Sequence, residues 1–214
     1  MAAAGRIDAP ASIRPLCVES QWQILVTMAE KLALTNQFLI AMPTLQDPNF
    51  FHSVTYICEH SDEGAMGIMI NRPLDINLGE VLGQMDISTE IDTVNHQPIF
   101  LGGPVQCERG FVIHKPHGEW DTTLKVTAEI GVTSSRDILE AIAEGRGPTK
   151  ALIALGYAGW GPGQLENEIS QNAWLSVPAD HSIVFETPFE RRWEAAAALS
   201  GVDIRRLSSD VGHA

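Results

Sequence analysis

The chain has 214 residues, 44% of them hydrophobic and 19% charged, which excludes a disordered chain and allows one large domain or two small ones. The 14 Lys and Arg residues against 27 Asp and Glu residues give a formal net charge of -13. Nucleic-acid binding usually requires a basic face, so we expect no direct, specific binding to DNA.

The first 35 residues differ from the rest of the sequence. Residues 1–15 are rich in Ala, Pro and Gly, which is typical of an unstructured tail. An amphipathic helix is predicted next, because seven apolar residues fall at helical spacing: Val18, Trp22, Leu25, Val26, Ala29, Leu32 and Ala33. Glu30 and Lys31 interrupt the apolar run that a secretory signal needs. We therefore interpret residues 1–35 as an N-terminal extension, with Met1 and Met28 as alternative starts, and residues 36–214 as the domain.

Short apolar runs bounded by Gly, Pro, Asn or Asp predict strands from Phe38 onward. The expected strands are residues 38–42, 53–58, 66–71, 99–101, 111–115, 124–130, 151–157 and 183–186, and the expected helices are 78–85, 134–143, 164–171 and 188–199. Thr187 is the expected N-cap of the last helix. No apolar run approaches the about 20 residues of a transmembrane helix, so we expect no membrane association. Because strands come in runs with few helices between them, the pattern favours a single α+β domain.

The cysteines and histidines form no recognisable chemical motif. Cys17, Cys58 and Cys107 are odd in number and include no CxxC pair, which argues against a disulfide framework and indicates a reducing, cytoplasmic compartment. Cys58 lies in an apolar run and is expected to be buried, and His114 with His117 is expected to be solvated. No HExxH or Gly-x-Ser-x-Gly motif occurs. The sequence therefore predicts no metal, no cofactor and no catalytic residues, and favours a non-enzymatic protein.

The glycine-rich residues 156–163 lie between an apolar strand and a helix, an arrangement that can bind phosphate. No Lys follows the glycines, and Glu166 and Glu168 already complement the helix dipole. We therefore favour a structural role, in which the glycines make room for a buried Trp160. Arg72 is expected to pair with one of these two glutamates. The alternative is a binding groove built from seven residues: Asn71, Arg72, Tyr157, Trp160, Gln164, Glu166 and Asn172.

Several long motifs resemble those of the AlgH/YqgE family. They include Phe-Leu-Ile-Ala-Met-Pro at 38–43, Gly-Ala-Met-Gly-Ile-Met-Ile-Asn-Arg-Pro at 64–73, Gly-Gly-Pro-Val at 102–105, Gly-Tyr-Ala-Gly-Trp-Gly at 156–161 and Gly-His-Ala at 212–214. The resemblance covers residues 36–214. It implies a compact α+β fold whose curved, bifurcated mixed sheet forms a pseudo-barrel with flanking helices.

The same resemblance bears on function. The family has no established enzymatic activity, and its association with alginate regulation gave some members the label of transcriptional regulator. We therefore expect a cytoplasmic, non-enzymatic protein that acts through a protein partner or a small ligand and affects transcription only indirectly. The alternative is an enzyme or a small-molecule-binding domain with its groove at residues 156–163.

Overall fold

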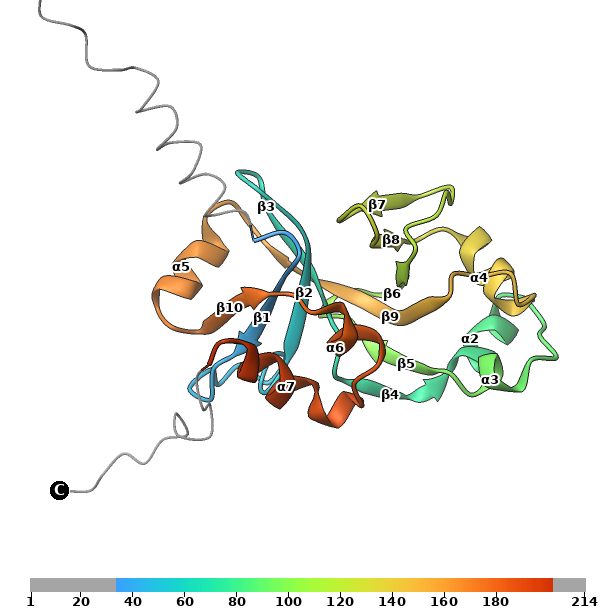
Figure 1. Ribbon diagram of the computed structural model, residues 1–214, viewed down its shortest axis with the longest axis horizontal. Helices are drawn as coiled ribbons and strands as arrows, with labels where there is room; N and C mark the ends of the chain where they lie inside the picture. The colour runs from blue at the N-terminus through green and yellow to red at the C-terminus, as the bar shows by residue number, and fades with distance from the viewer. Residues whose placement is uncertain (1–33, 202–214) are drawn as a thin grey trace, which may run out of the picture. The chain divides into compact units, whose positions relative to one another are not determined.

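The computed structural model describes residues 34–201, so the helix expected between Val18 and Ala33 and the motif at 212–214 lie outside the described residues. The strands, labelled as in Figure 1, are β1 (Gln37–Ala41), β2 (Val54–Ser61), β3 (Gly64–Met69), β4 (Pro73–Asn77), β5 (Pro98–Leu101), β6 (Val105–Lys115), β7 (Thr123–Lys125), β8 (Gly131–Thr133), β9 (Lys150–Trp160) and β10 (Trp174–Pro178). The helices are α2 (Leu78–Gln84), α3 (Asp92–Asn95), α4 (Arg136–Ala143), α5 (Gln164–Ser170), α6 (His181–Phe185), the 3-10 turn η1 (Phe189–Arg191) and α7 (Arg192–Leu199). No helix between residues 34 and 201 is long and apolar enough to cross a bilayer.

The described strands form one mixed sheet of ten strands, with the main order β10-β1-β2-β3-β9-β6-β8-β7. Its centre is β9, which pairs antiparallel with β3 and β6 and parallel with β5. The sheet divides at β9, because β5 pairs with residues 153–155 and β3 with residues 158–160. The sheet curls into a half-barrel in which β7 and β8 stand opposite β3 across β6 and β9 (Figure 1). This arrangement confirms the expected α+β fold with a curved sheet.

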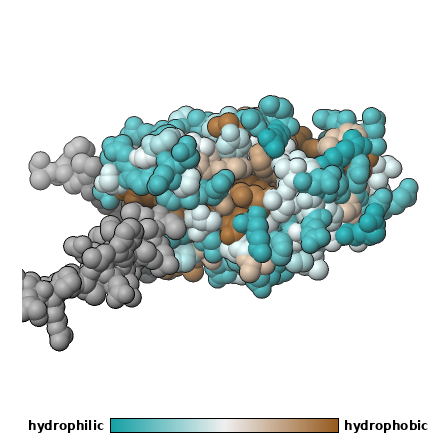
Figure 2. Space-filling view, turned by 90° about the horizontal axis from the view of Figure 1, so that it is seen from above, coloured by the Kyte–Doolittle hydropathy of each residue, from teal (hydrophilic) through white to brown (hydrophobic). Residues whose placement is uncertain are grey.

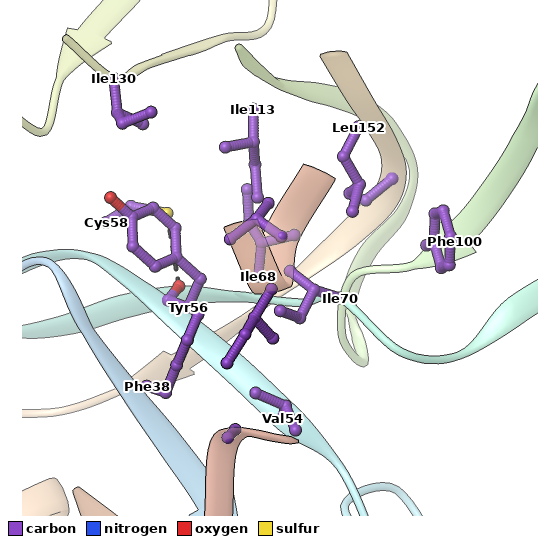
Figure 3. Close-up of a cluster of buried hydrophobic side chains, with 14 of the residues drawn as sticks. Phe38, Val54, Tyr56, Cys58, Ile68, Ile70, Phe100, Ile113, Ile130 and Leu152 are labelled. Atoms are coloured by element: carbon purple, nitrogen blue, oxygen red, sulfur yellow. Dashed lines mark hydrogen bonds between the residues drawn. The ribbon is translucent and has the colours of Figure 1, made fainter. Parts of the chain in front are cut away.

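The alternating side chains of each strand serve different hydrophobic clusters. Phe38 and Ile40 enter the largest cluster, whereas their neighbours Leu39 and Ala41 enter another, as the two-residue period of a strand requires. Figure 3 shows the largest cluster, to which β1, β2, β3, β5, β6 and β9 contribute buried side chains. Helices α6 and α7 complete it with Val184 and other apolar residues. The curled sheet therefore encloses the main core on one of its faces.

Helices cover apolar side chains on other parts of the sheet. Leu78 and Leu82 of α2 pack with Ile138 and Ile142 of α4 in a second cluster that includes Ile153 of β9. Helix α2 begins with a capping box, because the Asn77 side chain accepts from the Glu80 backbone N–H while the Glu80 side chain accepts from the Asn77 N–H. The third cluster places Leu165 of α5 against Leu39, Ile57, Trp160 and Trp174.

The predicted strand at residues 183–186 is wrong, because this segment forms helix α6. Ile183 and Val184 favour a strand locally, but Asp180 caps the helix by accepting from the Ser182 backbone N–H at 2.9 Å. The expected N-cap at Thr187 is also wrong, since its N–H donates to the Ser182 carbonyl at the end of α6. The segment after Pro188 is a 3-10 turn, and α7 begins at Arg192.

The glycine-rich region expected as a loop is partly strand, because β9 continues through Trp160. Gly156 interrupts the regular pairing with a φ of 72°. A Cβ atom at this position would lie 2.5 Å from the Gly103 carbonyl oxygen, so the close approach of the two chain segments requires glycine. The strand expected at 124–130 is shorter in the structure, because β7 ends at Lys125 and the chain turns back to form β8.

Candidate functional site

The structure does not bring the seven predicted groove residues together. Asn71 stabilises the chain segment at the start of β2. Its side chain accepts from the Val54 N–H at 2.8 Å and donates to the His52 carbonyl at 2.9 Å. The expected ion pair of Arg72 with Glu166 or Glu168 is wrong. The Arg72 guanidinium donates instead to the backbone carbonyls of two loop residues, Pro48 at 3.1 Å and Phe51 at 2.6 Å.

Trp160 belongs to a hydrogen-bonded aromatic corner whose polar groups satisfy one another. The indole N–H groups of Trp160 and Trp174 both donate to Glu168 Oε2, at 2.9 and 2.8 Å. The other carboxylate oxygen of Glu168 accepts from the Gln164 side chain at 2.9 Å. Phe50 stacks on Trp160, whose exposed fraction is 6%. This geometry supports the structural interpretation, in which Trp160 is a buried anchor.

Glu166 and Asn172 also have structural contacts. Glu166 Oε1 lies 2.7 Å from His60 Nε2, and His60 Nδ1 accepts from the Leu34 N–H at 3.3 Å. The His60 proton is therefore on Nε2, which donates to Glu166. The backbone N–H of Glu166, together with His60, holds the pKa of this carboxyl below its usual value. Asn172, with a φ of 57°, closes the turn after α5.

A different region forms an open groove with a volume of about 580 Å³. It lies between the β2–β3 hairpin and the β7–β8 pair, over β6 and β9. Met66, Leu124 and Tyr157 are half-buried there, beside the buried Phe111 and Val132. Figure 2 shows apolar residues gathered in the middle of a face with polar margins. All five apolar residues pack in or against the main core, so the groove exposes one end of the half-barrel interior.

Charged groups of both signs line the groove. Glu59 and Glu63 of the β2–β3 hairpin stand on one side, and Arg109 of β6 belongs to another wall. The Arg109 guanidinium lies 5.4 Å from the centre of the Phe111 ring and donates to Ser134 Oγ at 2.8 Å. None of the ion pairs within residues 34–201 includes Arg109. Its charge is therefore available to a bound group.

His114 holds the β8 wall of the groove from behind, although it was expected to be solvated. Its side chain is fully buried, and its Nδ1–H donates to the Pro116 carbonyl at 2.9 Å. Nε2 accepts from Thr133 Oγ1 at 2.8 Å, and Thr133 lies 2.7 Å from Thr123 Oγ1 of β7. Burial lowers the pKa of His114, because a charged imidazolium loses its hydration there.

Only Tyr157 and Trp160 of the predicted residues line this groove. The other groove residues come from several segments that sequence reasoning treated as ordinary strands and turns. Among residues 34–201, no three His, Cys, Asp or Glu side chains cluster as metal ligands would. The arrangement of an apolar floor with a few polar groups is suited to binding.

The sequence profile of a family described as AlgH-like matches residues 38–205. The chain belongs to the AlgH-like family. A UPF0301 protein from Nitrosococcus oceani is 60% identical over 179 residues, which cover 84% of this chain and 96% of the relative. A second, from Thioalkalivibrio sulfidiphilus, is 59% identical over 180 residues, with the same two coverages of 84% and 96%.

Solved structures agree with this AlgH-like assignment. The solution structure of the AlgH protein from Pseudomonas aeruginosa has a TM-score of 0.72 and 49% sequence identity, and it covers 86% of this chain and 97% of that chain. A crystal structure of a protein from Corynebacterium diphtheriae has a TM-score of 0.65 over 81% of this chain and 91% of that chain. At 20% identity, the second likeness concerns the fold alone. The predicted family and fold are thereby confirmed.

Proposed function

We propose that this AlgH-like protein is a non-enzymatic binding protein that holds an extended segment of a partner protein in its open groove. The observation that carries this proposal is an apolar lining, to which Met66 of β3 and Leu124 of β7 contribute, between strand edges. Apolar pockets with a few convergent polar groups are the usual form of a binding site. The volume of about 580 Å³ is large enough for several side chains of a peptide.

The free strand edges favour an extended peptide as the occupant. Within the described part of the chain, β7 is the terminal strand and pairs only with β8. On the other side, the pairing of β9 with β6 ends at Tyr157, so Gly159 has no strand partner on that edge. Both edges offer backbone N–H and C=O groups to a new strand. Main-chain hydrogen bonds would supply affinity, and the groove floor would select alternate apolar side chains.

The charges on the groove walls would set the orientation of the bound segment. Glu59 and Glu63 favour a basic side chain near the β2–β3 hairpin, whereas Arg109 favours an acidic one near β6. Such complementarity contributes more to specificity and association rate than to affinity. The ligand class that fits best is therefore an extended peptide with alternating apolar residues and charges of both signs.

Any effect on transcription would pass through this partner. The net charge of -13 disfavours contact with a phosphate backbone, so a bound regulator, rather than this chain, would contact DNA. The cytoplasm is the compartment that we propose, because the odd number of cysteines suits a reducing environment.

Leu124 and Lys125 of β7 provide a matched pair of positions for a test of peptide binding.

A displayed library of linear peptides, selected on the full-length protein, tests the proposal. We expect enriched peptides with apolar residues at alternate positions. Leu124→Asp places a charge in the apolar lining of the groove and should weaken their binding at least about tenfold, or about 1.4 kcal/mol. Lys125→Asp, the control on the exposed neighbour, should change binding much less. Enrichment of no peptide, or equal binding by both variants, would contradict the proposal, provided that thermal unfolding shows both variants to be folded.

A further inference from the structure

Arg192, the first residue of α7, is a buried cation that forms no ion pair with a described residue. Its exposed fraction is 7%. Nε donates to the Thr187 carbonyl at 3.0 Å, Nη1 donates to the Ile70 carbonyl, and the guanidinium lies 5.1 Å from the centre of the Phe100 ring. Arg192 takes part in none of the ion pairs among residues 34–201. A buried charge is normally paired, because its desolvation costs several kcal/mol.

Arg192 lines a cavity of about 290 Å³. The cavity walls include the rings of Phe100 and Phe189, which meet edge to face, and the aliphatic side chains of Leu152 and Val184. Figure 3 shows Phe100 and Leu152 on the same side of the main core. The cavity shares no lining residue with the open groove. It is therefore a separate site.

The terminal edge of the Arg192 guanidinium, formed by Nη1 and Nη2, has N–H groups that donate to no described residue. Nη1 uses one of its two N–H groups on Ile70, and Nη2 donates in no hydrogen bond to a described residue. Two neighbouring N–H groups on that edge can hold both oxygens of a carboxylate. The one carboxylate on the cavity wall, Glu186, pairs with Lys150 instead.

We propose that this cavity binds a small organic monoanion, a carboxylate attached to a compact aromatic or aliphatic body. The carboxylate would neutralise Arg192, and the body would pack in the cavity against the rings of Phe100 and Phe189. Leu152, Val184 and the two phenylalanine rings favour a ligand with an apolar body over a hydrated inorganic anion, because these side chains cannot replace the anion's hydrogen bonds to water. Burial lowers the pKa of Arg192 to about 10, so the guanidinium remains positively charged at neutral pH, and a bound anion would raise this pKa.

Benzoate and benzamide, measured by calorimetry on the full-length protein, test the charge requirement. The two molecules have nearly the same shape, but only benzoate carries a charge. We expect saturable binding of benzoate and at least about tenfold weaker binding of benzamide. Inorganic phosphate should not displace benzoate. The proposal is overturned if benzoate does not bind, if benzamide binds equally well, or if phosphate displaces benzoate at similar concentrations.

Variants locate the benzoate site within the molecule. Arg192→Gln removes the charge, and Phe189→Trp fills the cavity while retaining Arg192, so each should weaken benzoate binding at least about tenfold. Phe189→Trp decides the question if Arg192→Gln does not fold. Arg109→Ala is the matched control, since Arg109 also stacks on a phenylalanine but lies in the open groove. It should leave benzoate binding unchanged. A loss with Arg109→Ala, or no loss with a folded Phe189→Trp variant, would place the anion elsewhere.

Discussion

The aromatic corner around Trp160 and the open groove share strand β9, but they differ in how their polar groups are used. In the corner, Glu168 accepts from Trp160, Trp174 and Gln164, so its two carboxylate oxygens are occupied. In the groove, Arg109 has no carboxylate partner among the residues that the structure describes. In the aromatic corner, the residues that stand out in the sequence therefore serve to pack the fold. In the open groove, the candidate site consists of side chains that can still contact a ligand.

The largest expected effect is the loss of the corner's anchor. Trp160→Ala should lower the free energy of unfolding by about 3–5 kcal/mol, because it removes a large buried ring and leaves a cavity. Leu124→Ala, at a half-buried residue of the groove lining, should cost only about 1 kcal/mol. Urea denaturation of both variants measures the difference. If Trp160→Ala hardly changes the free energy of unfolding, Trp160 is not a buried anchor, and the aromatic corner becomes a candidate binding site.

The groove wall should be sensitive to mild acid through His114. Its pKa is lowered in the folded state, so the unfolded chain binds the proton more readily. The unfolded side chain titrates near pH 6.5, and stability should therefore fall as the pH decreases below that value. One such group contributes at most about 1.4 kcal/mol per pH unit.

Unfolding of the wild type and two variants between about pH 7 and pH 5 isolates this contribution. His114→Gln should give a flatter dependence of stability on pH than the wild type. His96→Gln, the same substitution at an exposed histidine, is the control for effects unrelated to the buried site. An equally steep dependence in the His114→Gln variant would show that other groups cause the acid sensitivity.

The smallest expected effect on stability comes from the groove's own charge. Arg109→Ala should change the free energy of unfolding by no more than about 0.5 kcal/mol, because an exposed arginine contributes little. The same variant should weaken the binding of the peptides that were selected on the protein, particularly of those with an acidic residue. Combined unfolding and binding measurements separate the two roles. A large loss of stability would mean that Arg109 supports the fold, as Trp160 does.

Three elements show which structural features the local sequence pattern can predict and which it cannot. The helix expected at 78–85 is α2, because capping by Asn77 and Glu80 is a local interaction. The apolar, partly β-branched side chains of residues 183–186 favour a strand locally, yet these residues form α6, which covers the core. His114 lies in a strand that was correctly expected, but its burial depends on the distant Thr133 and on the chain turn at Pro116.

The sequence by itself determined the family, the α+β class and the burial of Cys58, because long motifs and apolar runs are properties of neighbouring residues. The tertiary structure alone decided the groove, since the curl of the sheet joins residues 59–66, 106–111, 122–134 and 157–160. It also decided the environments of Arg72, Arg109 and Arg192. The reason is that a charge interacts with whatever lies within a few ångströms of it in space, and distance along the chain does not predict that neighbour.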